Sequence, residues 1–273
     1  MKGIKRIWIW VRNILIVLFI SSVLAVVAYK FIPVYYTPLM FIRLFEQVQE
    51  GKPRKLDHIW VPVSRIAQPL VQAVVASEDN LFLDHSGFDL EQIRKAREEA
   101  EKGKRIRGAS TISQQTAKNV FLWPGKSYFR KGIEVYFTLL IEWIWSKERI
   151  MEVYLNSIEM GDGIYGAEAV AQAHFKKPAK DLTNREAALI AASLPNPRKF
   201  DSGKPSPYLL KRQAKIISLM GKLLKINIGY EGNGPQEKSG KVKKRKKWRA
   251  MITLKRIRNT ENEKFYIPGS RPY

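Results

Sequence analysis

Several residue types that often define a function are absent or scarce in this chain of 273 residues. It contains no cysteine, which excludes disulfides, thiolate metal sites and cysteine nucleophiles. Its three histidines, His58, His85 and His174, do not have the spacing of a metal site. No clear alternation of polar and apolar residues predicts strands, so the candidate core must be built mainly from helices.

Acidic residues are also scarce relative to basic ones. The chain has 25 Asp and Glu against 48 Lys and Arg, a formal net charge of +23. Such an excess favours an anionic partner: a nucleic acid, an anionic lipid or a phosphate-bearing substrate. No winged-helix, zinc or RNA-recognition pattern accompanies the charge, so we expect no nucleic-acid partner.

An almost wholly apolar run occupies residues 7–29. A helix of that length, at about 1.5 Å per residue, crosses a hydrocarbon core of roughly 30 Å. Lys2, Lys5 and Arg6 precede the run, so the positive-inside rule places the N-terminus in the cytoplasm and the rest of the chain outside. A cleaved signal peptide is the alternative, although no small-residue cleavage pattern follows. We therefore expect a single-pass membrane protein whose main domain lies outside the cytoplasm.

Composition divides the chain into four predicted segments. They are the cytoplasmic N-terminus with the transmembrane helix (1–30), an aromatic-rich juxtamembrane segment and linker (31–58), a mainly α domain (59–225) and a basic C-terminal tail (226–273). Residues 31–45 are suited to the headgroup boundary of a membrane. The tail contains basic clusters with interspersed apolar residues and is expected either to bind anionic lipid or to be a solvated tail.

Apolar periodicity in the large segment predicts helices. They span residues 69–77, 90–101, 111–121, 128–145, 147–155 and 184–194. Asp89 and Thr183 have capping-box partners three residues later, and Ser146 is placed to cap a helix. Ser110 is expected to cap the helix that follows it. The segment 161–166, GDGIYG, matches a dinucleotide-binding pattern, but it follows a helix, so we interpret it as a turn.

Glu78 is the first candidate for chemistry. It falls at the carboxyl end of an apolar helix, where the helix dipole and the neighbouring Val74 and Val75 disfavour a negative charge. A carboxylate in that setting is suited to take a proton from a sugar hydroxyl as a general base. On periodicity alone, a solvated acidic helix end remains the alternative.

A second candidate site is basic. Arg130 and Glu134 are four residues apart, so they project from one helix face, and Lys118 and Lys126 can reach the same region. Cations gathered around one carboxylate fit a diphosphate group. An ordinary helical ion pair is the alternative for Arg130 and Glu134.

Five motifs in order make the sequence resemble a known family. They are ED-x-x-F-x-x-H-x-G-x-D at 78–89, G-x-STI-x-QQ-x-x-KN at 108–119, RK-x-x-E at 130–134, KERIMEVYLN at 147–156 and REAALIAASLPNPRKFDS at 185–202. Together they resemble glycosyltransferase family 51 over roughly residues 59–215. The resemblance implies a mainly α, lysozyme-like domain of two lobes with a cleft between them, preceded here by one transmembrane helix.

The activity implied by this resemblance is that of a peptidoglycan glycosyltransferase, anchored in the cytoplasmic (inner) membrane with its catalytic domain in the periplasm. Such an enzyme polymerises lipid II into β-1,4-linked glycan strands, inverts the donor carbon and releases undecaprenyl diphosphate, in cell wall biogenesis and the maintenance of cell shape. No Ser-x-x-Lys occurs, so we expect a monofunctional enzyme without a transpeptidase domain.

Site residues follow from the same resemblance. Glu78 matches the general base, and Glu134 matches a second carboxylate beside the donor diphosphate. Basic positions around that diphosphate match Lys118, Lys126, Arg130 and Lys131. Positions that shape the cleft match Asp79, Ser110, Thr111, Gln114, Gln115 and Asn119. A divalent cation, expected to be Mg²⁺, would bridge the diphosphate and Glu134.

The expected partners are lipid II, the growing glycan strand and the membrane, together with penicillin-binding transpeptidases or divisome proteins. A lysozyme-like lytic enzyme that cleaves existing glycan is the alternative function. It would share the fold but would have no use for cations beside the cleft, because its substrate lacks a diphosphate. A non-catalytic scaffold would not need both Glu78 and Glu134.

Overall fold

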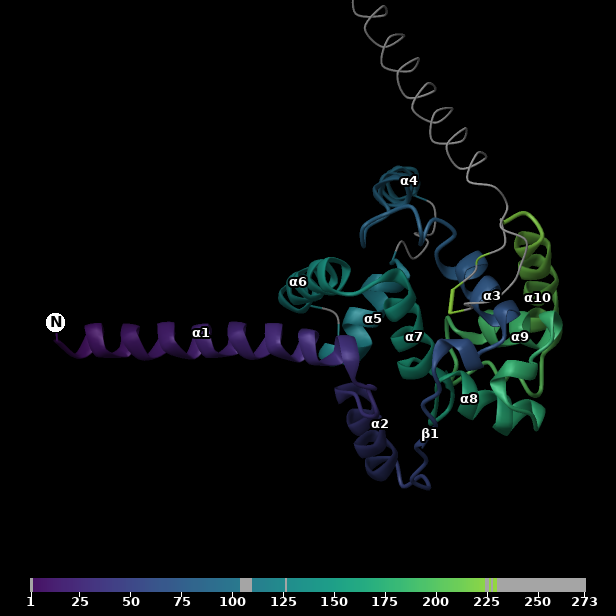
Figure 1. Cartoon of the computed structure of the whole chain (residues 1–273), viewed down its shortest axis with the longest axis horizontal. Helices are drawn as coiled ribbons and strands as arrows, with labels where there is room; N and C mark the ends of the chain where they lie inside the picture. The colour runs from purple at the N-terminus through teal and green to yellow at the C-terminus, as the bar shows by residue number, and fades with distance from the viewer. Residues whose placement is uncertain (1, 104–109, 126, 224–225, 227, 230–273) are drawn as a thin grey trace, which may run out of the picture. The chain divides into compact units, whose positions relative to one another are not determined.

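The computed structural model describes residues 2–103, 110–125, 127–223, 226, 228 and 229. They belong to one unit, Met1–Tyr230, whereas the unit Glu231–Tyr273 lies outside the described residues. Helices dominate the described part, which confirms the predicted mainly α fold (Figure 1). The predicted basic tail falls almost entirely outside it.

The N-terminal helix α1, Lys2–Phe31, is the longest element. Its segment Ile4–Phe31 has a window of mean hydropathy 2.5 and is long and apolar enough to cross a membrane. Apolar side chains such as Trp8 and Leu15 are exposed on it. An amphipathic surface helix would bury such residues along one stripe, so exposure along most of the helix is compatible with a membrane anchor or a signal sequence.

The last turns of α1 are joined to the folded domain. Trp145 donates from Nε1 to the carbonyl of Val26 at 2.8 Å. Arg149 donates to the carbonyl of Tyr29 from Nε at 3.0 Å and from Nη2 at 2.8 Å, and it also reaches the carbonyl of Ile32. The last four carbonyls of a helix have no partner within the helix, and Arg149 supplies one to Tyr29.

We expect Arg149→Ala to lower the melting temperature of the full-length protein in detergent by about 4–8 °C. The variant removes charge-assisted hydrogen bonds typically worth about 1.5–3 kcal/mol, and about 1 kcal/mol shifts the melting temperature of a domain of this size by roughly 2–4 °C. Arg94→Ala, on an exposed helical ion pair, is the matched control. Equal melting of the two variants would contradict this account of how α1 is attached.

The juxtamembrane segment contains a helix that the sequence analysis missed. Helix α2, Pro38–Gln49, begins with Thr37 as N-cap and Pro38 in its first turn, and it packs against α5. Met40 is buried, whereas Phe41 and Phe45 remain exposed. Thr37 and Pro38 are helix-start signals that can be read in the sequence. Most residues of this helix are apolar, however, so the sequence shows no clear helical period there.

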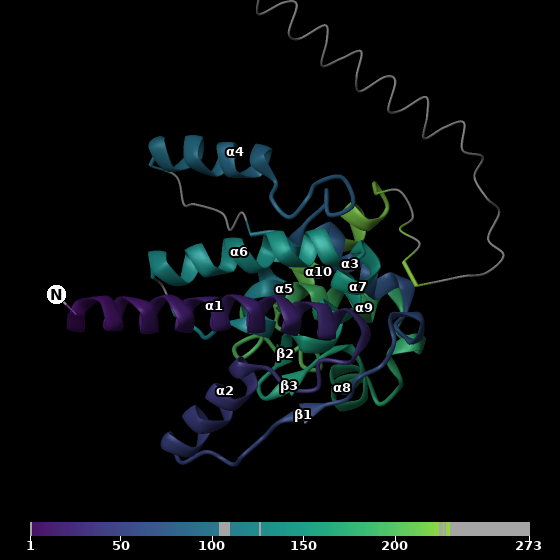
Figure 2. The same cartoon turned by 60° about the vertical axis from the view of Figure 1, so that its left-hand side comes forward.

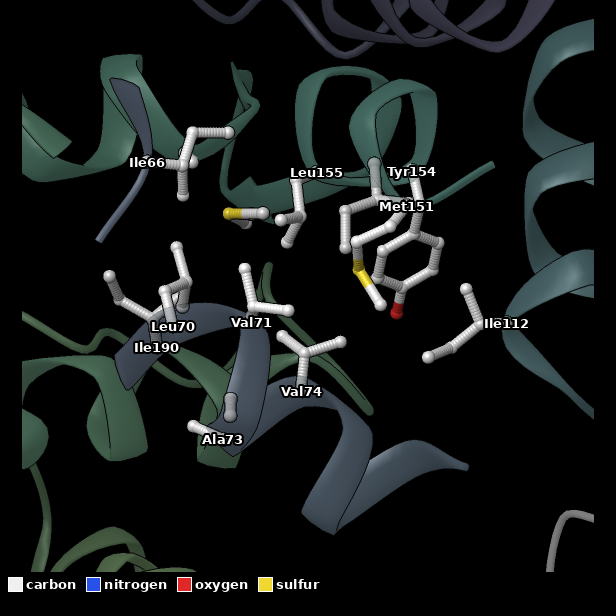
Figure 3. Close-up of a cluster of buried hydrophobic side chains, with 14 of the residues drawn as sticks. Ile66, Leu70, Val71, Ala73, Val74, Ile112, Met151, Tyr154, Leu155 and Ile190 are labelled. Carbon is white, nitrogen blue, oxygen red and sulfur yellow. The ribbon is translucent and has the colours of Figure 1, made fainter. Parts of the chain in front are cut away.

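Two groups of helices form the domain. Helices α3 (Gln68–Glu78), α9 (Asn184–Ser193) and α10 (Pro207–Met220) pack on one another, and α5 (Ile112–Phe121) packs on α6 (Tyr128–Ile144) and α7 (Lys147–Ser157). Figure 2 shows α6 running beside α1. Figure 3 shows Val71 and Val74 of α3 near Met151 and Leu155 of α7, so the core continues from one group to the other.

The remaining elements are helix α4, which has 12 residues, and several short segments. They are α4 (Leu90–Glu101), α8 (Ala167–Val170), the 3-10 helices η1 (Val63–Arg65) and η3 (Ala179–Asp181), the π-helical turn η2 (Ala171–Phe175), and strands β1 (Asp57–His58), β2 (Glu159–Gly161) and β3 (Ile164–Tyr165). The strand order is β1-β3-β2, with β1 parallel and β2 antiparallel to β3. Strands of two or three residues are too short to show a period, so the sequence analysis missed them.

The turn predicted at residues 161–166 is confirmed in part. Residues 162–163 connect β2 to β3, whereas Gly161 ends β2, Ile164 and Tyr165 form β3, and Gly166 is the N-cap of α8. Gly163 has φ +68°, and a Cβ there would lie 2.6 Å from the carbonyl oxygen of Lys55. Only glycine fits that close approach with a left-handed backbone.

The six predicted helices are all present, with boundaries shifted by no more than a few residues. Asp89, Ser146 and Thr183 act as N-caps as predicted. The predicted cap at Ser110 is wrong. Thr111 is the N-cap of α5 and forms a reciprocal capping box with Gln114, whereas Ser110 is exposed.

Candidate active site

Glu78 is the last residue of α3, on the edge of that helix's buried face. Its Oε2 accepts a hydrogen bond from Gln115 Nε2 of α5 at 3.2 Å, and its Oε1 accepts one from Ser77 Oγ at 3.1 Å. Arg212 Nη2 of α10 lies 3.9 Å from Oε1. The carboxylate side chain is 15% exposed, so it is held from three helices while part of it remains accessible.

Gln115 is itself held by Tyr154 of α7. The Tyr154 hydroxyl donates to Gln115 Oε1 at 3.2 Å. Burial raises the pKa of the Tyr154 hydroxyl well above its usual value, and the nearby charges of Glu78 and Asp79 raise it further. Tyr154 therefore stays protonated and serves as a hydrogen-bond donor throughout the physiological pH range.

Asp79 anchors the loop that follows Glu78. Its carboxylate oxygens lie 2.9 and 3.0 Å from His85 Nε2, and Oδ2 accepts from the backbone N–H of Ile112 at 3.0 Å. His85 Nδ1 accepts from the backbone N–H of Gly87 at 3.1 Å, so Nε2 carries the proton that faces Asp79. The arrangement ties the 79–89 loop to the first turn of α5.

A second connection fixes the same loop. Thr111 Oγ1 donates to the carbonyl of Gly87 at 2.6 Å. Gly87 has φ +88°, and a Cβ there would lie 2.9 Å from Thr138 Cγ2 of α6. The backbone of this loop is therefore pressed against α5 and α6, in a conformation that a larger residue would strain.

The predicted basic site is assembled around Glu134. Arg130 Nη1 lies 3.0 Å from Glu134 Oε2, and Lys131 pairs with Oε1. The Glu134 and Arg130 side chains are buried, at 4% and 10% exposed, whereas Lys131 is nearly half exposed. Arg130 Nε is buried and has no hydrogen-bond partner within the described residues.

Lys118 lies on α5 near this group. Desolvation by the surrounding protein lowers the pKa of its ammonium, although part of the side chain reaches solvent. The negative charge of Glu134 raises this pKa, whereas the positive charges of Arg130 and Lys131 lower it further. An ammonium surrounded by more cations than anions is prepared to receive an anion. Lys126, the fourth predicted cation, lies outside the described residues.

The other residues predicted to shape the cleft lie on α5 or just before it. Thr111 and Gln114 form the capping box of α5 and are buried. Asn119 is buried on the same helix, and Ser110 is exposed just before it. The geometry gives Thr111 and Gln114 the role of holding the start of α5, the helix that carries Gln115 and Lys118.

Two residues near the base were missed by the sequence analysis. Tyr154 lies within the KERIMEVYLN segment, but α7 reads as an ordinary amphipathic helix, and nothing in its spacing points to Gln115. Arg212 lies on α10, which the sequence analysis did not predict as a helix. Its Nε is buried without a hydrogen-bond partner in the part of the chain that is described. Contacts between residues so distant in sequence leave no periodic signal.

The base candidate and the basic group are linked by one helix. Gln115, which binds Glu78, and Lys118, which feels the charge of Glu134, are three residues apart on α5 and therefore on one face. The residue that contacts the candidate base and one of the cations that can stabilise a departing anion thus lie about one helical turn apart on α5. This combination suits transfer of a group from a phosphate leaving group to a hydroxyl.

Comparison with known proteins agrees with this geometry. The family model described as Transglycosylase matches residues 45–221. A biosynthetic peptidoglycan transglycosylase of Bacteroides thetaiotaomicron is 60% identical over 217 residues, covering 80% of this chain and 88% of the relative. Proteins of the same name from Caulobacter vibrioides (53% identity; 77% of this chain and 91% of the relative) and Shewanella oneidensis (45%; 84% and 97%) are also similar. The chain belongs to the transglycosylase family and is a peptidoglycan glycosyltransferase.

Proposed function

We propose that Glu78 is the general base with which this enzyme extends glycan strands from lipid II. Glu78 takes the proton of the 4-hydroxyl of the acceptor N-acetylglucosamine. The oxygen then bonds to the anomeric carbon of the donor N-acetylmuramic acid as the bond to the diphosphate breaks. Polyprenyl diphosphate leaves with the electron pair, and the configuration inverts from α to β.

The basic group explains why one general base is enough. A diphosphate leaves as an anion and requires electrostatic stabilisation more than a proton. Lys118, Arg130 and Lys131 offer cationic donors to its oxygens. Glu134 orients Arg130 and Lys131 and limits the repulsion between them.

The observation that carries the proposal is the hydrogen bond from Gln115 to Glu78, three residues before Lys118 on the same face of α5. This contact supports the proposal because the same helix carries the partner of the proposed base and one of the cations that would bind the leaving group. A lytic enzyme would use the carboxylate but not the cations.

The test incubates the purified full chain with lipid II and, separately, with preformed glycan, and sizes both products on a gel. Polymer from lipid II with intact glycan is expected; shortening of the glycan without polymer would favour the lytic alternative.

A divalent cation fits this site only as an ion shared with the substrate. The described residues contain no group of three or more His, Asp or Glu that could hold a metal by themselves. Mg²⁺ often binds through one carboxylate and phosphate oxygens, and Glu134 could supply the carboxylate if the half-exposed Lys131 moved aside. Such an ion would neutralise part of the diphosphate charge.

We expect chelation of divalent ions to lower the polymerisation rate, since Glu134 and the cations would then hold the diphosphate alone. The measurement titrates Mg²⁺ into chelator-treated enzyme with lipid II as substrate. Glu134→Gln should weaken the response to Mg²⁺ as well as the maximal rate. A rate that is the same with chelator and with Mg²⁺ would contradict a role for the ion.

The apolar helix supports a single-pass anchor in the cytoplasmic membrane. With Lys2, Lys5 and Arg6 on the cytoplasmic side, the domain that follows α1 would lie in the periplasm, where glycan strands are made. The side chains that hold the end of α1 would keep the active site close to a membrane-bound substrate. Penicillin-binding transpeptidases or divisome proteins are proposed partners, because the glycan product still requires crosslinking.

The basic tail is proposed to bind anionic lipid. Residues 238–258 contain eleven Lys or Arg with apolar residues between them. Each basic residue near an anionic surface contributes up to about 1 kcal/mol at low ionic strength. We expect a chain that ends at Tyr230 to bind anionic vesicles more weakly than the full chain, when residues 7–29 are deleted from both, with a difference that shrinks as salt rises. Equal co-sedimentation at low salt would contradict the proposal.

A further inference from the structure

We infer that Tyr154 positions the base Glu78 through the side-chain amide of Gln115, although its hydroxyl does not contact the carboxylate. The inference rests on the proposed role of Glu78. It assigns Tyr154 as a positioning residue and Gln115 as the connection between the two.

Tyr154 is fixed by its surroundings. Its side chain is fully buried, and Figure 3 shows its ring beside Met151 with Ile112 of α5 nearby. A ring packed in this way has little freedom, so its hydroxyl presents a donor at a constant place. The hydroxyl donates to Gln115 Oε1. A tyrosine hydroxyl can also accept a hydrogen bond, so the group at the other end of the amide decides which way the amide is turned.

The two partners of the Gln115 amide agree on one orientation. A glutamine amide has an oxygen end and a nitrogen end of nearly the same shape. The Glu78 carboxylate can only accept, so the nitrogen end donates to its Oε2, and the Tyr154 hydroxyl holds the oxygen end by donating to it. The flipped amide would direct its oxygen at the carboxylate, where two acceptors would repel each other.

The other contacts of Glu78 do not replace this connection. Ser77 and Arg212 both approach Oε1, whereas Gln115 is the donor to Oε2 among the contacts of the described residues. Ser77 is the preceding residue and cannot fix the carboxylate relative to α5. The Gln115 amide therefore determines how the carboxylate is turned relative to the helix that carries Lys118.

The test is a double-mutant cycle on kcat with lipid II as substrate. Tyr154→Phe removes the hydroxyl but keeps the ring, and Gln115→Met removes the amide but keeps the length. Each is expected to lower kcat about tenfold, the scale of one hydrogen bond, with little change in KM. If both act through one connection, the double variant should also lose about tenfold and not about a hundredfold.

Tyr165→Phe is the matched control. Tyr165 is buried in the same domain, and its hydroxyl has no hydrogen-bond partner within the described residues. Its kcat should equal that of the parent. A general weakening of the core by loss of a buried hydroxyl would affect both tyrosines, whereas loss of base positioning would affect Tyr154 alone.

Three outcomes would overturn the inference. They are a parental kcat for Tyr154→Phe, multiplicative losses in the double variant, or an effect confined to KM. If Tyr154→Phe does not fold, the inference is tested with Gln115→Met alone. A kcat of Gln115→Met equal to that of the parent would show that the connection through Gln115 is not needed. Failure of the proposed function would look different: the parent would not polymerise lipid II, or Glu78→Gln would remain active.

Discussion

Glu78→Gln is expected to lower the rate of lipid II polymerisation by at least about a hundredfold, the usual scale for loss of a general base. Glutamine keeps the shape of the side chain but cannot take the proton of the acceptor hydroxyl. Binding of lipid II should survive, because the cations that receive the diphosphate belong to α5 and α6. The measurement pairs a gel assay of polymer with equilibrium binding of lipid II.

Glu148→Gln provides the matched control. Glu148 is an exposed residue in the first turn of α7, and the same substitution there should leave the rate unchanged. Substantial turnover by the Glu78 variant would mean that another group accepts the proton. Loss of both binding and turnover would instead indicate that the substitution disturbs the fold near Asp79.

Arg130→Ala is expected to produce the next largest loss, about tenfold to a hundredfold in kcat/KM for the donor. A charge-assisted hydrogen bond to phosphate is worth about 1.5–3 kcal/mol, and the loss of Arg130 also leaves the buried Glu134 with one cationic partner fewer. Arg130→Lys should retain part of the activity, because it keeps the charge but not the fork of donors. Lys118→Ala should act in the same direction.

The effect of these substitutions on stability must be separated from their effect on binding of the donor substrate. Arg97→Ala, on an exposed ion pair of α4, controls for loss of a surface charge. Thermal melting of Arg130→Ala shows how much of the effect comes from the buried Glu134. Parental kcat/KM in both Arg130→Ala and Lys118→Ala would rule out the diphosphate assignment.

The fold could be predicted from the sequence where a signal is local. Caps at Asp89, Ser146 and Thr183 require only residues within one turn, and the structure confirms them. Arg130 and Glu134 share a helix face because they are four residues apart, and they form the expected ion pair. Local reasoning failed at Ser110, where two adjacent residues could both cap and the reciprocal bond with Gln114 favours Thr111.

Contacts between distant segments could not be predicted. The sequence places Glu78 at a helix end, but the partners that hold its carboxylate come from α5 and α10 and were not foreseen. The role of Tyr154 depends on a hydrogen bond across 39 residues of chain. Likewise, Arg149 meets the end of α1 across 120 residues. Each contact depends on how helices pack, which periodicity within a helix does not encode.

The motifs and the geometry support the function in different ways. The ordered motifs imply the reaction, and the structure supplies the physical connection between its parts. Asp79 and Thr111 hold the 79–89 loop on α5, and α5 carries Gln115 toward the base and Lys118 toward the basic group. In the proposed mechanism, this one helix connects the group that accepts the proton with the cations that stabilise the leaving group.

The configuration of the bond formed from lipid II tests the central claim most directly. If Glu78 activates the acceptor hydroxyl for a single displacement at the donor carbon, the first disaccharide linkage made by the purified chain must be β. NMR of the short products, or their digestion by a β-1,4-specific muramidase, reports this configuration. The account predicts β linkages only; an α linkage would contradict direct displacement with Glu78 as the base.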